Sequence, residues 1–163
     1  MSDLVFSSEQ FVDQPRQRVF AFFSDPANLE SITPPWLRFR ILKRSTPEIG
    51  EGTEFTYGLS LRGLPMRWRS RIEEWQPGER FVDVQLSGPY AKWHHTHSFH
   101  DRGNGTLIRD CVRYRLPLGR LGLFLMGRFV ASDVRRIFDF RAARVHELLA
   151  GEETGRDRDV TRA

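Results

Sequence analysis

The chain has 163 residues, of which 39% are hydrophobic and 12% aromatic, and its formal net charge is +4. This length predicts one domain with a sizeable core. The basic residues are spread along the chain without a helix-turn-helix, zinc or RNP pattern, which argues against a nucleic-acid partner. The absence of a bilayer-length apolar run argues against stable membrane insertion, and the single cysteine, Cys111, excludes an internal disulfide. No leader pattern opens the sequence, so we expect a cytoplasmic location.

The first elements predicted are a strand and a short helix. Residues 4–12 form the strand. Pro15 suits the first turn of the helix, for which Asp13 or Gln14 would provide the N-terminal cap. The Asp25-Pro26 pair is predicted to end this helix and to begin a second one.

The second short helix is predicted over residues 27–32. Thr33-Pro34-Pro35 ends it, because proline lacks a backbone N–H and restricts the preceding residue. Residues 36–43 then alternate between apolar and basic side chains, which predicts a strand over this segment.

An amphipathic hairpin is predicted over residues 55–61 and 66–72. A turn at Gly63-Leu64 would pair Tyr57 with Ser70. One face of this hairpin is apolar and the other is polar, as in an antiparallel sheet with one solvated face. The solvated face carries three arginines, Arg67, Arg69 and Arg71.

The next predicted strand, residues 80–86, follows a turn at Pro77-Gly78, and its register is ambiguous. Alternation alone would bury the valines and the leucine of this strand. A tight Pro-Gly turn would instead place Phe81, Asp83 and Gln85 on the inner face.

Two strands, residues 93–100 and 106–114, flank Asn104-Gly105, which is a strong signal for a two-residue hairpin turn. This turn would pair Phe99 with Asp110. Side chains alternate along a strand, so His94 and His100 are expected to face solvent. The opposite, inward face would carry Trp93, His95, His97, Phe99, Asp110, Val112 and Tyr114.

The last third of the chain changes to a helical period. Apolar residues recur at steps of three or four residues from 130 to 149, which predicts a long amphipathic helix beginning near 119–123 and ending at Gly151. We expect residues 1–150 to form the domain and 151–163 a disordered charged tail. The fold class is α+β, with six to seven antiparallel strands curved around this helix.

Several segments resemble the START-like, helix-grip superfamily, which includes polyketide cyclase/dehydrase and coenzyme Q-binding proteins and birch-pollen allergen relatives. The resemblance covers residues 4–150 and is greatest to small bacterial members of unassigned function. It rests on residues 15–25, 50–53 and 75–81, on Gly88-Pro89-Tyr90, on the Trp93-x-His95-x-His97-x-Phe99 strand, and on the segment from Asp110 to Pro117.

The resemblance implies that Asp83 and Gln85 face inward and that the sheet and the long helix enclose a cavity. An inner face rich in aromatic groups with a few polar ones is typical of a site for a small hydrophobic or lipid-like molecule. No cofactor is expected. The predicted ligand-binding residues are Tyr57, Trp68, Ser70, Phe81, Asp83, Gln85, Trp93, His95, His97, Phe99, Asp110 and Tyr114.

Three other interpretations of the inward polar groups remain open. The first is a cyclase or dehydratase in which His95 is the general acid or base, a chemistry that the superfamily contains. The second is a zinc site at His95 and His97 with Asp110 or Asp83, although no fourth ligand is evident and we expect no metal. The third is a filled core in which these groups satisfy one another.

Residues 116–129 form a second unusual segment, because they are strongly apolar and contain internal glycines and regularly spaced arginines. The segment suits a mobile lid or a transient contact with a lipid surface, with Arg120 and Arg128 at the headgroups. It also suits the buried start of the long helix, and the sequence does not decide among these roles.

Overall fold

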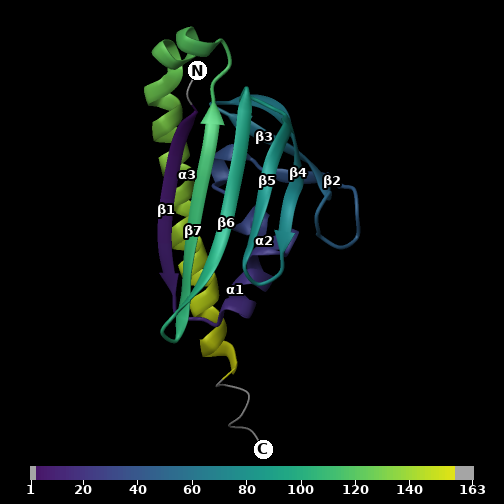
Figure 1. Cartoon of the computed structure of the whole chain (residues 1–163), viewed down its shortest axis with the longest axis vertical. Coiled ribbons are helices and arrows are strands. Elements are labelled where there is room, and N and C mark those ends of the chain that lie inside the picture. Colours follow the sequence, from purple (N-terminus) through teal and green to yellow (C-terminus); the bar gives the residue numbers. More distant parts are fainter. Residues whose placement is uncertain (1–2, 157–163) are drawn as a thin grey trace, which may run out of the picture.

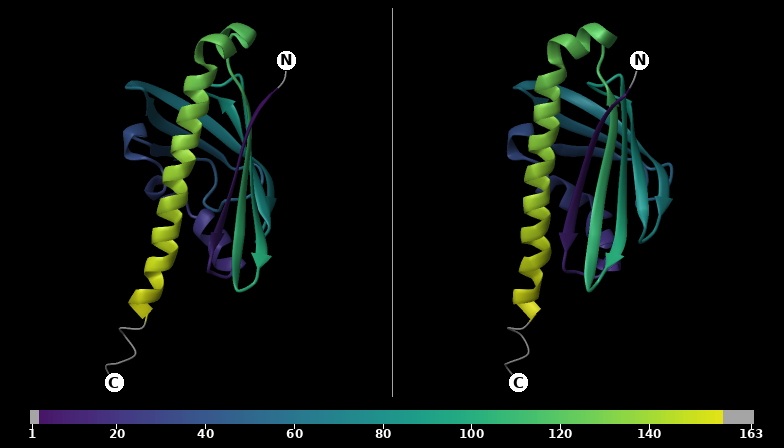
Figure 2. Two further views of the ribbon diagram at one scale, coloured as in Figure 1. Left: turned by 90° about the vertical axis from the view of Figure 1, so that its left-hand side faces the viewer. Right: turned by 60° about the vertical axis from the view of Figure 1, so that its left-hand side comes forward.

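A twisted seven-stranded sheet and a long helix that crosses one of its faces form the computed structural model, which describes residues 3–156 (Figures 1 and 2). All neighbouring strands are antiparallel, in the order β1-β7-β6-β5-β4-β3-β2. The predicted α+β helix-grip architecture is therefore confirmed. The strands are β1 (Leu4–Val12), β2 (Arg40–Arg44), β3 (Glu54–Leu61), β4 (Leu64–Gln76), β5 (Arg80–Ser87), β6 (Lys92–Arg102) and β7 (Gly105–Arg115).

Two short helices, α1 (Arg16–Phe23) and α2 (Pro26–Ser31), follow the first strand as predicted. The Asp25 carboxylate accepts a hydrogen bond from the Ala27 N–H at 2.9 Å and so caps α2. The predicted cap of α1 is wrong. Pro15 occupies that position without a side-chain hydrogen bond, whereas the buried Gln14 amide donates to the Leu149 carbonyl at 3.3 Å.

The predicted strand over residues 36–43 is only half correct. The 3-10 helix η1 (Pro35–Leu37) covers its beginning, and Arg38 takes a left-handed backbone conformation with φ of 46°. Strand β2 therefore begins only at Arg40. A positive φ at a non-glycine residue is uncommon, and the alternating pattern does not reveal it.

Both predicted hairpin registers are wrong by two residues, because each turn lies one residue earlier than expected. In β3–β4 the central residues are Arg62-Gly63, so Tyr57 pairs with Trp68. In β6–β7 they are Gly103-Asn104, with φ of 58° at Gly103. A shift of two residues leaves every side chain on its expected face. It does change which residues lie opposite each other on adjacent strands, and this matters for the candidate site described below.

The long helix α3 (Gly119–Arg156) begins where predicted and packs along β1, as Figure 2 shows. It continues past Gly151, where the sequence predicted its end. A lone glycine costs a helix only about 1 kcal/mol relative to alanine, so it need not terminate one. Of the tail predicted as disordered, residues 151–163, the first six belong to α3, and residues 157–163 lie outside the described part of the chain.

Candidate functional site in the cavity under the long helix

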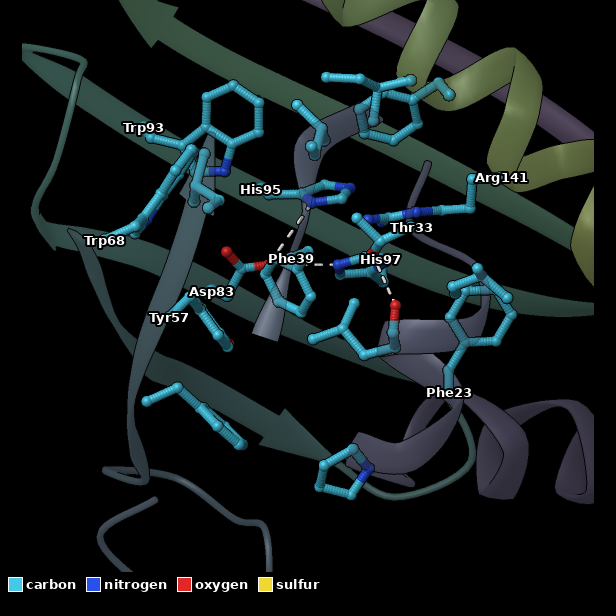
Figure 3. Close-up of a pocket in the computed structure, with 18 of the residues that line it drawn as sticks. Phe23, Thr33, Phe39, Tyr57, Trp68, Asp83, Trp93, His95, His97 and Arg141 are labelled. Carbon is cyan, nitrogen blue, oxygen red and sulfur yellow. Dashed lines mark hydrogen bonds and ion pairs between the residues drawn. The ribbon is translucent and has the colours of Figure 1, made fainter. Parts of the chain in front are cut away.

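A cavity of about 180 Å³ lies between the inner face of the sheet, the short helices and α3 (Figure 3). For comparison, a closed apolar cavity of about 150 Å³ is large enough to bind benzene. Its walls are mainly aromatic and aliphatic, and they include Phe23, Phe39, Tyr57, Trp68, Trp93 and Phe138. The inner face of the sheet thus encloses space for a ligand, and the filled core considered above does not describe this region.

Seven of the twelve predicted ligand-binding residues line this cavity: Tyr57, Trp68, Phe81, Asp83, Trp93, His95 and His97. As the resemblance implies, Asp83 faces inward. The other five are not part of its lining. Ser70 donates a hydrogen bond to the Tyr57 hydroxyl at 3.2 Å, and the Gln85 amide bonds the Tyr90 backbone at 2.7 and 3.3 Å. The remaining three, Phe99, Asp110 and Tyr114, are buried.

The polar part of the cavity is a cluster of four side chains from three adjacent strands, called here the His–Asp cluster: Asp83, His95, His97 and Asp110. Cross-strand pairing places Asp83 opposite His95, and His97 opposite Asp110. The imidazole rings of His95 and His97 lie 3.7 Å apart between centroids. Both rings are almost completely buried, with exposed fractions of 3% and 4%.

Each carboxylate of the His–Asp cluster contacts both histidines. Nε2 of His95 lies 2.8 Å from Oδ1 of Asp110, and its Nδ1 lies 3.5 Å from Oδ1 of Asp83. Nε2 of His97 lies 3.2 Å from Oδ1 of Asp83. Its Nδ1 is 2.9 Å from Oδ1 of Asp110, but without the alignment of a hydrogen bond.

The two histidines have opposite pKa shifts. Burial lowers the pKa of His97, but its contacts with Asp110 and Asp83 outweigh burial and raise the pKa above 6.5. Burial and the charge of His97 together lower the pKa of His95. Burial would raise the pKa of both carboxylates, yet the histidines hold the pKa of each below 3.8. These shifts favour two carboxylates, a protonated His97 and a neutral His95.

Asp83, His95 and His97 are also the described residues that could hold a metal ion, since one ligand atom from each lies within 4.8 Å of the others. Imidazole and carboxylate ligands suit zinc or iron. The Nε2 atoms of both histidines already face carboxylate oxygens. Hydrogen bonds between these groups therefore satisfy the cluster without a metal ion. That the site holds no metal stays a prediction.

Sequence reasoning missed the basic residue of the cavity, Arg141 of α3. Figure 3 shows its side chain reaching from the helix toward the two histidines. Burial lowers the pKa of this guanidinium, and the charges of Asp110 and Asp83 oppose that shift. One signal could have identified it. Arg141 lies seven residues after Val134 and four before Val145, and both valines are buried, so it occupies an apolar position of the helix.

The model of a protein family described as polyketide cyclase/dehydrase and lipid transport matches residues 12–140 of the chain. This description suggests ligand binding or a cyclase-type role. No curated protein matches the chain.

Solved structures share the fold at low sequence identity. TTHA0849 from Thermus thermophilus is 19% identical, with a TM-score of 0.69 over 91% of this chain and 99% of that one. Protein NE0264 from Nitrosomonas europaea is 13% identical, with a TM-score of 0.68 over 93% and 97% of the two chains. The di-domain ARO/CYC protein BexL from the BE-7585A biosynthetic pathway is 21% identical, with a TM-score of 0.63 over 88% and 45%. These likenesses show the fold alone.

Proposed function

The chain belongs to the polyketide cyclase/dehydrase and lipid transport family, and we propose that it binds a small hydrophobic or lipid-like molecule in the cavity between the sheet and α3. The observation that carries this proposal is the largely apolar cavity of about 180 Å³, with Asp83, His95 and His97 on its sheet wall and Arg141 on its helix wall. A few convergent polar groups in an apolar pocket orient a ligand that has one polar end. The expected cytoplasmic location stays a prediction.

A neutral fluorescent probe, N-phenyl-1-naphthylamine, tests the proposal because it responds to apolar sites without needing a charge. We expect one probe to bind per chain. The substitution Ile137→Trp, on the wall formed by α3, should weaken binding at least about tenfold because the larger ring fills the cavity. Leu42→Trp is the matched control, since Leu42 is 55% exposed on β2, and it should bind as the wild type does.

The result that contradicts cavity binding is an Ile137→Trp protein with native circular dichroism and unchanged probe affinity. Native mass spectrometry of the protein from its own host adds a second measurement. A copurifying lipid or quinone supports the proposal.

The alternative function is a cyclase or dehydratase in which His95 moves a proton. The observation that favours it is the His95 ring, which lies in the cavity wall with one nitrogen held by Asp110 at 2.8 Å. A carboxylate behind an imidazole orients the ring and tunes its basicity, as general acid–base catalysis requires. Catalysis would change the mass of the bound molecule. His95→Ala should abolish this change, whereas the control His100→Ala should not, and that result would establish catalysis over binding alone.

The beginning of α3 supports a further proposal, transient contact with a lipid surface. Seven large apolar side chains here are 43–85% exposed and are called the apolar tip: Leu118, Leu121, Leu123, Phe124, Leu125, Met126 and Phe129. In Figure 2 this part of the helix extends beyond the sheet. Arg120 and Arg128 lie among these residues, and a mixed apolar and basic surface suits an anionic bilayer. None of the described helices has the length and apolarity needed to cross a membrane.

Sedimentation with vesicles of phosphatidylcholine and phosphatidylglycerol measures this contact. We expect the wild type to bind and Phe124→Asp to reduce binding at least about tenfold, because Phe124 is 85% exposed at the centre of the apolar tip. Val5→Asp, at a 62% exposed position on β1, should leave binding unchanged. Absence of wild-type binding, or a wild-type dimer that Phe124→Asp dissociates, would contradict the lipid contact.

A further inference from the structure

The guanidinium of Arg141 lines the cavity and has no acceptor among the described residues. Its Nε atom is buried and has no hydrogen-bond partner among the described residues. The group lies near Asp83 and Asp110 but forms no ion pair with either in the described part of the chain, while its Cζ sits 5.2 Å from the centroid of the Phe138 ring. Buried polar groups in proteins almost always have a partner, and an unpaired buried charge is costly. The missing partner of Arg141 is therefore expected in the cavity itself.

The two carboxylates near the cavity already have partners. Asp83 and Asp110 each contact both histidines, at 2.8 to 3.5 Å, whereas the Arg141 guanidinium forms no ion pair with the described residues. An acidic ligand would thus meet a guanidinium that neither of these carboxylates already pairs.

From this arrangement we infer that the cavity selects apolar molecules that end in a carboxylate, which the Arg141 guanidinium binds. The inference rests on the proposed cavity binding and names its ligand class. Guanidinium matches carboxylate geometry with two parallel N–H donors, and such charge-assisted bonds are among the strongest in proteins. The aromatic and aliphatic walls then hold the rest of the molecule.

Ligands with the same apolar chain and different polar ends separate the contribution of the carboxylate to binding from that of the chain. Isothermal titration of the wild type with decanoate, 1-decanol and decanamide should give at least about tenfold tighter binding for decanoate. 2-Naphthoate with 2-naphthol as its neutral partner repeats the comparison on an aromatic body, and so distinguishes a fatty-acid-like from an aryl ligand.

Arg141→Met removes the guanidinium while keeping an unbranched side chain. It should lower the affinity for decanoate about 10- to 100-fold and leave that for 1-decanol within about threefold. Arg141→Lys should recover only part of the loss, since lysine keeps the charge without the two-pronged geometry. The control Arg135→Met, at an exposed position of the same helix, should change neither affinity.

The possible results distinguish this inference from the proposal on which it rests. Equal binding of decanoate and 1-decanol by the wild type, or a carboxylate preference that persists in Arg141→Met, would overturn the carboxylate inference while cavity binding stands. Failure of every apolar ligand and of N-phenyl-1-naphthylamine to bind would overturn both. Because Arg141 forms no ion pair with the described residues, Arg141→Met should melt no lower than the wild type.

Discussion

Replacing Asp110 with asparagine is expected to lower the free energy of unfolding by about 3–5 kcal/mol, as measured by urea denaturation. The carboxylate is buried and contacts both histidines, at 2.8 and 2.9 Å. Its loss leaves the charge of His97 buried with one acceptor fewer. Removing one member of a buried, hydrogen-bonded ion pair has an effect of this size because the other charge keeps its desolvation penalty.

The control for Asp110 is Glu9→Gln. Glu9 also pairs with a cation of β7, because its carboxylate accepts a hydrogen bond from Arg109 at 2.6 Å, but this pair is exposed. Exposed ion pairs contribute about 0–1 kcal/mol. If Asp110→Asn lowered the free energy of unfolding as little as Glu9→Gln, the His–Asp cluster would be uncharged or accessible to water.

Asp110→Asn should also change how the free energy of unfolding depends on pH. The pKa of His97 is raised on folding, so its contribution is complete below 6.5 and is lost as pH rises through the raised value. The pKa of Asp110 is lowered, so its contribution is present above 3.8 and is lost as pH falls through the lowered value. In Asp110→Asn, stability should begin to decline at a lower pH than in the wild type, because His97 then has a single carboxylate to hold its proton.

Replacing Phe99 with alanine should also destabilise the fold by about 3–5 kcal/mol. Phe99 is 1% exposed, and its ring packs against Phe20 and Phe23 at centroid distances of 5.4 and 5.3 Å. The cost has two parts, the lost burial of the ring and the space left where the neighbours cannot close in. Thermal and urea unfolding both measure it.

The matched control for this change is Phe124→Ala. Phe124 is 85% exposed in the apolar tip, so its truncation should change the free energy of unfolding by no more than about 0.5 kcal/mol in the absence of lipid. A loss below about 1 kcal/mol for Phe99→Ala would indicate that the aromatic cluster collapses around the missing ring.

The sequence predicted the fold well, because strands with one apolar face and a helix with one apolar stripe impose a single layered arrangement. The family resemblance is confirmed, and the inward placement of His95 and His97 follows from simple alternation. The pairing of His97 with Asp110 could not be predicted, because it depends on a turn at Gly103-Asn104 rather than at the more familiar Asn104-Gly105.

Two features of the site were not predicted. Alternation could not settle the register of β5, since both Phe81 and Val82 are buried. Arg141 was missed because a long helix rich in arginine contains many exposed ones, although its spacing from Val134 and Val145 places it on the apolar stripe. Its entry into the cavity depends on the position of the helix over the sheet.

The pairing of β1 with β7 has a consequence for how the protein reaches this shape. Leu4 lies opposite Tyr114 and Val12 opposite Thr106, so no residue of the first strand meets its partner until more than about ninety further residues have been synthesised. Contacts of such large sequence separation form slowly, because a long loop must close first. The helix that covers the inner face is made after the strands of the sheet, so an incomplete chain exposes the apolar walls of the future cavity. Nascent chains of this protein are therefore candidates for chaperone binding up to the completion of α3.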